Sequence, residues 1–263
     1  MTDAHCHVSC GDSSVRELLV GRDFFGVHPW ETIDGTAETD RTTETRRALV
    51  PDVTVVPDVP FLTALLATLR ARLLDNPKAG VGEIGLDRLK VRDIPPLMRE
   101  VFEAQLALAF ELGRPVVLHG AKCWGQVVTT VCRHLSHSPT PPLPHSPTPS
   151  FLFHGFSRSD GLIPEIVKLG GFISVGPAVL NDHAVNYREL VKKIPLDRLL
   201  VETDAVVGAC VPTRPHIREV LEKTAEILGI SSAELERITD ENADRFLNNS
   251  ATLRLCVKNR TPN

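Results

Sequence analysis

Long hydrophobic runs are missing from this sequence. Nowhere does it contain the roughly 18 uninterrupted apolar residues that a membrane-spanning helix needs. Charged and histidine side chains between Asp3 and Glu17 interrupt the first twenty residues, which rules out the apolar core of a signal peptide. We therefore expect a protein of the cell interior, cytoplasmic or nuclear, with no membrane partner.

Cysteine is sparse as well. The 263 residues include six cysteines, too few for a disulfide scaffold, and no two of them form a Cys-x-x-Cys pair. Zinc and redox sites built on such pairs are therefore excluded. Reduced and mostly buried thiols are expected.

The chain also lacks an excess of positive charge, because 29 Lys and Arg stand against 33 Asp and Glu and leave a formal net charge of −4. A protein that holds nucleic acid through a broad basic surface needs clustered cations that face the phosphates. Any phosphate-containing substrate must therefore be held locally. Hydrophobic residues at 42% and charged residues at 24% are typical of a globular protein with a sizeable core.

Short β-type segments alternate with longer amphipathic segments, a pattern typical of βα units repeated around a parallel sheet. Strands are expected at residues 2–8, 24–27, 79–83, 115–119, 151–154, 171–175 and 199–202. Prolines crowd an eighth candidate at 53–56 and disfavour it as a central strand. Helices are expected at 62–74, 96–112, 125–134, 162–169, 186–194, 215–228 and 232–238. The pattern predicts an α/β fold in one domain, residues 1–263, built as a (β/α) TIM-type barrel.

A proline-rich segment interrupts this pattern at residues 135–150, where the pentapeptide His-Ser-Pro-Thr-Pro occurs twice. Such a segment cannot form a strand ladder or fill a core, so an exposed surface insertion is expected. It joins a helix to the next strand, which in a βα barrel places it on the face opposite the active site. Its His137 and His145 are not expected to bind metal, because a flexible tract holds no fixed geometry.

Histidines and carboxylates fall at the ends of several expected strands. In a βα barrel the carboxyl ends of all strands open onto one mouth, so these side chains should share a pocket. Alternation along the first strand turns both of its histidines to the same side. A set of ordinary core histidines would require several independent coincidences of placement. The residues are His5, His7, Glu83, His119, His154 and Asp204.

This residue set indicates a metal centre. Imidazole and carboxylate ligands together suit Zn²⁺, Mn²⁺ or Fe²⁺, and a carboxylate-rich part of the site also admits Mg²⁺. Six ligands are more than one tetrahedral ion takes, so we expect two divalent ions, Mg²⁺, Mn²⁺ or Zn²⁺, that share a ligand. Glu83 is the natural shared ligand because a carboxylate has two oxygens.

Seven motifs covering nearly the whole chain carry a family resemblance. They are Asp3-Ala4-His5-Cys6-His7, Gly26-Val27-His28-Pro29, Gly82-Glu83-Ile84-Gly85-Leu86-Asp87, Pro115-Val116-Val117-Leu118-His119, His154-Gly155-Phe156-Ser157, Ile173-Ser174-Val175-Gly176 and Leu200-Val201-Glu202-Thr203-Asp204-Ala205. In this order they resemble the TatD-type metal-dependent deoxyribonucleases, a family of amidohydrolase-like barrels. The resemblance implies a distorted βα barrel that hydrolyses phosphodiester bonds of DNA with divalent metal. It further implies that one ion is held by His5, His7 and Asp204, the other by His119 and His154, with Glu83 between them.

The sequence departs from the family in three places. An arginine usually follows the histidine of the fifth strand, whereas here Lys122 offers a point charge in place of a bidentate fork. Asp204 is followed by Ala205-Val206 and not by the usual Ala-Pro. Only eighteen residues separate His7 from Gly26, too few for the usual strand and two helices. One βα unit is therefore expected to be missing or displaced in the first third.

The expected substrate is DNA, as single strands or at ends. Asp204 and Glu83 are the expected catalytic residues: Asp204 orients and deprotonates the attacking water, and Glu83 holds both ions. His28 is expected either to contact the scissile phosphate or to anchor the Pro29-Trp30 turn. Cations just past strand ends would hold phosphates, and aromatic side chains near the mouth would either stack on bases or be buried. The cations are Arg88, Lys122, Arg158 and Arg214, with Lys122 and Arg158 foremost, and the aromatic residues are Trp30, Trp124 and Phe156.

Two other functions stay open. Related barrels perform many hydrolyses, so the metals could instead serve a small amide, ester or lactone. The altered first third also leaves room for a scaffold that has lost turnover and acts through a protein partner.

Overall fold

The computed structural model describes residues 1–32, 59–137, 148–206 and 216–248, except for the side chains of 59–61 and 137. Three features of the sequence fall outside these residues. They are the candidate strand at 53–56, the central part of the proline-rich segment with His145, and Arg214.

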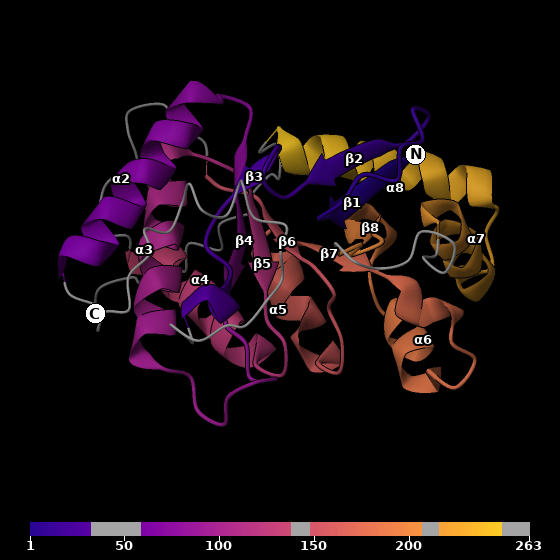
Figure 1. Ribbon diagram of the computed structural model, residues 1–263. Helices are drawn as coiled ribbons and strands as arrows, with labels where there is room; N and C mark the ends of the chain where they lie inside the picture. The colour runs from indigo at the N-terminus through magenta and orange to yellow at the C-terminus, as the bar shows by residue number, and fades with distance from the viewer. Residues whose placement is uncertain (33–58, 138–147, 207–215, 249–263) are drawn as a thin grey trace, which may run out of the picture.

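The strands of the described residues run parallel to one another. They are β1 (Thr2–Cys6), β2 (Arg16–Leu19), β3 (Phe24–Phe25), β4 (Gly80–Gly85), β5 (Val116–His119), β6 (Phe151–Phe153), β7 (Phe172–Val175) and β8 (Leu199–Val201). β1 pairs with β2, and β3 to β8 form a second sheet in chain order. In Figure 1, β4, β5 and β6 run through the centre of the molecule, and β1 and β2 lie together near the N-terminus.

Backbone contacts at two seams join the two sheets into a barrel. At one seam, Val20 and Phe24 form a parallel bridge that connects the end of β2 to the start of β3. At the other, the Asp204 N–H donates to the His5 carbonyl at 3.0 Å, and the His7 N–H donates to the Ala205 carbonyl at 2.9 Å. The expected TIM-type barrel is therefore present.

The first third of the chain shows how the barrel is distorted. β2 was not among the predicted strands, because Arg16–Leu19 is short and has polar residues in its first half. Only residues 7–15 separate β1 from β2, and only 20–23 separate β2 from β3, with no helix in either connection. The sequence predicted that one βα unit is missing or displaced here. The structure shows that the first two units keep their strands, β1 and β2, and lack the helices after them.

Helices cover the outside of the barrel from β3 onward. They are α2 (Val59–Asp75), α3 (Pro96–Leu112), α4 (Trp124–His137), α5 (Ile163–Lys168), α6 (Val185–Val191), α7 (Ile217–Leu228) and α8 (Ser232–Leu247). In Figure 1, α2 and α3 lie on the side of β3 and β4, whereas α7 and α8 lie on the side of β1, β2 and β8. No helix of the described segments is both long and apolar enough to cross a membrane.

A small apolar cluster fills the barrel interior, and α8 contributes to it. Phe246 of α8 is fully buried, with its ring centroid 5.8 Å from that of Phe24 and 6.0 Å from that of Phe172. The Asn242 side chain donates to the carbonyl of Leu199, at the start of β8. α8 therefore lies against the amino ends of the strands. The cluster comprises Ala4, Leu18, Phe24, Val117, Leu152, Phe172, Leu200, Ala243 and Phe246.

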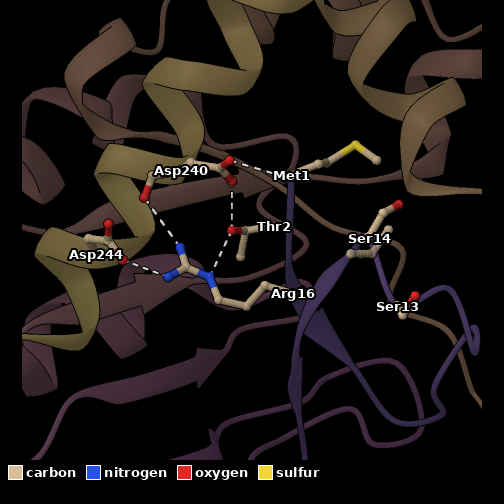
Figure 2. Close-up of a pocket in the computed structure, with 8 residues that line it drawn as sticks. Met1, Thr2, Ser13, Ser14, Arg16, Asp240 and Asp244 are labelled. Atoms are coloured by element: carbon tan, nitrogen blue, oxygen red, sulfur yellow. Dashed lines mark hydrogen bonds and ion pairs between the residues drawn. The ribbon is translucent and has the colours of Figure 1, made fainter.

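A cavity of about 380 Å³ opens at this same end, between α8 and the first two strands (Figure 2). Arg16 crosses it, donating to Thr2 Oγ1 at 3.0 Å and pairing with Asp244 at 2.5 Å. Thr2 in turn donates to Asp240 at 2.7 Å. These contacts fasten α8 to β1 and β2, far from the strand ends where the sequence places the chemistry.

Candidate metal centre

The carboxyl ends of the strands bring the six predicted ligands together around Glu83 of β4. Glu83 Oε1 lies 2.5 Å from His119 Nδ1 and 2.6 Å from His154 Nε2. Glu83 Oε2 lies 3.2 Å from His7 Nε2 and 3.3 Å from His5 Nε2. Each carboxylate oxygen therefore faces a different pair of histidines.

Asp204 completes the side of the cluster that β1 provides. Its Oδ1 lies 3.8 Å from Nε2 of both His5 and His7, and its side chain is 45% exposed. Its backbone φ of 47° is a left-handed conformation that non-glycine residues seldom adopt. Asp204 is thus the carboxylate of the cluster that reaches furthest toward solvent.

His28 lies closer to the cluster than the sequence indicated. Its Nε2 is 3.3 Å from Glu83 Oε1, and its ring is edge-on to His119 at 4.7 Å between centroids. The buried Gln105 side chain holds the preceding residue, accepting from the Val27 N–H at 2.7 Å and donating to the Val27 carbonyl at 3.1 Å. His28 therefore faces the same Glu83 oxygen as His119 and His154.

The donor atoms suit metal ions. Among the residues that the structure describes, three groups each bring one ligand atom per residue within 4.8 Å of the others. They are His5 with Glu83 and His154, His5 with His7 and Asp204, and His28 with Glu83 and His119. His5 is fully buried, yet neither of its ring nitrogens has a hydrogen-bond partner in the described structure. Buried polar atoms are rarely left unpaired, so the Nε2 of His5, which faces Glu83 and Asp204, fits coordination by an ion.

Charge in the cluster is shared between Glu83 and the surrounding histidines. Burial alone would raise the pKa of Glu83, but the neighbouring His154, His28 and His119 outweigh it and hold the pKa well below its usual range. Burial opposes protonation of His154, yet the carboxylates of Glu83 and Glu202 raise its pKa well above the ordinary value. The Glu83 carboxylate thus favours a positive charge on His154, as it would favour a cation bound beside it.

His119 is held between two carboxylates. Burial would lower its pKa, but the charge of Glu83 and the hydrogen bond with Asp87 raise it. Its Nε2 lies 2.7 Å from Asp87 Oδ2, on the opposite side of the ring from Glu83. A histidine that binds metal through one nitrogen commonly pairs its other nitrogen with a carboxylate in this way.

Glu202 organises the neighbouring strand ends. It is fully buried, accepts from the Gly155 N–H at 2.6 Å and accepts from the Ser174 hydroxyl at 2.5 Å. Its Oε1 also lies 3.8 Å from His154 Nδ1. Glu202 thereby ties β7 and the segment after β6 to the segment after β8, beside the His154 ring. Glu202 lies two residues before Asp204, a spacing that turns both side chains to the same face of an extended segment.

Gly85 permits the close approach of the two central strands. It pairs with His119 in the β4–β5 register, and a Cβ on Gly85 would lie 2.0 Å from the His119 carbonyl oxygen. Any side chain here would push β4 away from β5. The glycine therefore sets the short distance between Glu83 and His119.

Of the predicted substrate contacts, His28 touches the cluster, whereas Lys122 and Arg158 do not. Lys122 and Arg158 are exposed, and no ion pair in the described residues joins either one to a ligand. Both adopt left-handed backbone conformations, with φ of 58° and 57°. Backbone strain of this kind is concentrated at functional sites.

The three aromatic residues predicted to stack on bases differ in their exposure to solvent. Trp124 and Phe156 are buried, and their rings pack together at 5.2 Å between centroids, which excludes them as stacking surfaces. They are buried because their apolar rings fill the layer between α4 and β6. Trp30 is 36% exposed and remains available at the mouth.

Comparison with known proteins identifies the family. The family model described as TatD related DNase matches residues 20–248. The chain is 30% identical over 172 residues to the "Uncharacterized metal-dependent hydrolase YabD" of Bacillus subtilis (strain 168), covering 63% of this chain and 64% of that protein. It is 31% identical over 176 residues to the "3'-5' ssDNA/RNA exonuclease TatD" of Pectobacterium atrosepticum, covering 63% and 64%. The chain thus spans less than two thirds of the length of these relatives.

Solved structures agree on the fold. The crystal structure of YjjV, a TatD homolog from Escherichia coli K12, matches with a TM-score of 0.56 at 27% identity, covering 70% of each chain. A TatD family hydrolase from Entamoeba histolytica matches with a TM-score of 0.58 at 18% identity, covering 88% of this chain and 75% of that one. The second likeness concerns the fold alone.

Proposed function

The chain belongs to the TatD related DNase family, and we propose that it is a divalent-metal-dependent deoxyribonuclease that hydrolyses phosphodiester bonds of DNA. The observation that carries the proposal is the position of Glu83, whose two carboxylate oxygens face two different pairs of histidines. Such a carboxylate is suited to bridge two ions. Paired ions are a recurring solution for phosphodiester hydrolysis.

Two ions would divide the residues as follows. His5, His7 and Asp204 would hold one, since their donor atoms form one compact group. His119 and His154 would hold the other, and Glu83 would be the ligand shared by both. His28 belongs to the second side of the centre, where it completes a group with Glu83 and His119. Mg²⁺, Mn²⁺ and Zn²⁺ all accept this mixture of imidazole and carboxylate.

The ions, when bound, act as Lewis acids that activate water and offset the charge developing on the phosphoryl group. The protein's own part begins with Asp204, the exposed carboxylate, which orients the attacking water and accepts its proton. Asp87 fixes the ring of His119 through a 2.7 Å hydrogen bond, and Glu202 places a negative charge beside His154, so these groups do not have to reorganise during the reaction. Lys122 and Arg158, exposed after β5 and β6, attract the phosphates next to the reacting one.

DNA as single strands or at ends is the proposed substrate. One relative carries the name of a 3'-5' ssDNA/RNA exonuclease, which supports a nucleic acid substrate. A net charge of −4 argues against wide contact with a duplex backbone. The cysteines in the described residues, Cys6, Cys10, Cys123 and Cys132, are free, as suits the proposed location inside the cell.

A substrate comparison tests this proposal. Purified protein loaded with Mg²⁺, Mn²⁺ or Zn²⁺ is given a single-stranded oligonucleotide, a duplex, an aryl ester and a lactone. We expect metal-dependent cleavage of the single strand that stops when a chelator is added. Hydrolysis of the ester or lactone without cleavage of DNA would favour the small-molecule hydrolase. Absence of any turnover in a protein that binds metal would favour a scaffold.

A further inference from the structure

Trp30 stands at the edge of the metal centre. It belongs to the short helix Pro29–Thr32, and its ring centroid lies 5.0 Å from that of His28 and 6.5 Å from that of His119. The backbone N–H of Trp30 donates to His28 Nδ1 at 3.1 Å. An indole that is 36% exposed is thus held beside two histidines of the cluster.

A cationic segment packs against this indole. Lys90 Nζ lies 3.9 Å from the centre of the Trp30 ring, within the range of a cation–π contact. The neighbouring Arg88 and Arg92 are also exposed, and Leu89 between them is 53% exposed. Asp93 is the one exposed acid among residues 88–93 of the described chain, so three cations oppose a single carboxylate.

The same segment is fastened to the metal centre by Asp87. One Asp87 oxygen meets His119 Nε2 at 2.7 Å, and the other accepts from the Leu89 N–H at 2.5 Å. The Arg88 N–H donates to the Ala121 carbonyl at 2.9 Å, and its guanidinium donates to the Arg92 carbonyl at 3.1 Å. These bonds hold the cations at a fixed place beside the mouth.

We propose that Trp30 and Lys90 form the binding site for the nucleotide next to the scissile phosphate of a single DNA strand. The base stacks on the Trp30 indole, and the Lys90 ammonium moves from the ring onto the adjoining phosphate. This inference rests on the proposed nuclease function. It adds an aromatic and a cationic contact in the combination that single-strand binding proteins use. It also explains how a chain of net charge −4 attracts a polyanion through a few local cations.

Fluorescence measures binding independently of turnover. The protein contains two tryptophans, of which Trp124 is buried, so Trp30 is the one that a ligand at the mouth can reach. The metal-loaded protein is titrated with a phosphorothioate oligothymidylate that resists cleavage. We expect quenching in the wild type and its loss in Trp30→Phe, while Trp30→Phe retains most of the affinity because a phenyl ring still stacks.

Kinetics on two substrates test the role in catalysis. Trp30→Ala and Lys90→Ala should each raise KM for a single-stranded oligonucleotide about tenfold, with kcat changed less than about twofold. For bis(p-nitrophenyl) phosphate, which has no neighbouring phosphate, the KM should rise much less in Lys90→Ala than the KM for the oligonucleotide does. Lys90→Ala should also flatten the dependence of log affinity on log salt by about 0.7, the value for one phosphate on a single strand. Lys78→Ala, which removes an exposed lysine before β4 at the opposite end of the barrel, is the matched control.

The outcomes separate this inference from the proposed function. Suppose that the wild type cleaves DNA. If Trp30→Ala and Lys90→Ala then have the wild-type KM, or if the oligonucleotide does not quench wild-type fluorescence, the Trp30 and Lys90 site is overturned and the nuclease stands. Quenching that depends on Trp30 in a protein that cleaves no DNA upholds the binding site and overturns the nuclease.

Discussion

Asp3 and Thr203 are separated by 200 positions in the sequence and are joined by two hydrogen bonds in the structure. The Thr203 N–H donates to Asp3 Oδ1 at 2.9 Å, and the Thr203 hydroxyl donates to Asp3 Oδ2 at 2.6 Å. Asp3 lies in β1, two residues before His5, and Thr203 directly precedes Asp204. The pair therefore holds together the two chain segments that supply the ligands of one proposed ion.

Replacing Asp3 should impair the centre without removing a ligand. Asp3→Ala leaves two buried donors of Thr203 without acceptors and frees the segment that carries Asp204, so we expect roughly 10- to 100-fold lower metal affinity or activity. Asp3→Asn keeps one acceptor and should lie between Asp3→Ala and the wild type. Metal titration and initial rates check this order. Equal metal affinity in Asp3→Ala and the wild type would show that the pair serves the fold alone.

Phe246 should be one of the most sensitive positions for stability. Its ring fills the barrel interior between Phe24 and Phe172, so Phe246→Ala should lower the free energy of unfolding by about 3–5 kcal/mol. Val185→Ala on α6 is the control, because Val185 is 61% exposed and its truncation should cost less than about 0.5 kcal/mol. Urea denaturation measures both values. A loss below about 1 kcal/mol for Phe246→Ala would mean that Phe246 does not pack in the barrel interior as described.

The sequence predicted the ligands of the centre better than it predicted what supports them. His5, His7, Glu83, His119 and Asp204 could be placed because parallel strands end at a common mouth, which turns a pattern along the chain into proximity in space. Their metal-binding role remains a prediction. The Asp3–Thr203 bonds were not foreseen, because side-chain pairing across the first and last strands depends on the exact register of barrel closure.

Local patterns also set limits on the fold prediction. β2 was not predicted, because a four-residue strand with two polar residues shows too little hydrophobic periodicity to be distinguished from a loop. The last helix was expected to end at residue 238 but continues to Leu247. Its second half is polar on one side, and its buried face of Thr239, Asn242, Ala243 and Phe246 is defined only by contact with the strand ends.

Metal binding should release protons near neutral pH. The pKa values of His119 and His154 are raised by the Glu83 carboxylate, so both rings retain protons at a pH where a free imidazole would lose them. Coordination requires the unprotonated nitrogen, and affinity should therefore fall as the pH is lowered. Calorimetry in two buffers of different ionisation enthalpy counts the released protons. His183→Asn, which changes an exposed histidine outside the cluster, should release as many as the wild type, and a count of zero in the wild type would contradict the assignment of these ligands.

Lys122 and Arg158 should act on substrate affinity more than on turnover. Both are exposed at the ends of neighbouring strands, so Lys122→Ala and Arg158→Ala should raise KM for DNA and reduce the salt dependence of binding. The effect on kcat should be much smaller than that of Asp204→Asn, which removes the proposed proton acceptor. Steady-state rates over a salt series provide the measurement. An unchanged and steep salt dependence in both variants would place the DNA on another surface.

The claim that Glu83 joins two metal ions in one hydrolytic centre is tested most directly by elemental analysis of Glu83→Gln beside the wild type, with single-strand cleavage measured on the same samples. Gln keeps the size of the side chain and removes the charge that the surrounding imidazoles need. We predict two ions per wild-type chain, fewer in a folded Glu83→Gln, and a cleavage rate reduced by a factor on the order of 100 or more. A folded Glu83→Gln that keeps two ions and the wild-type rate would contradict the claim.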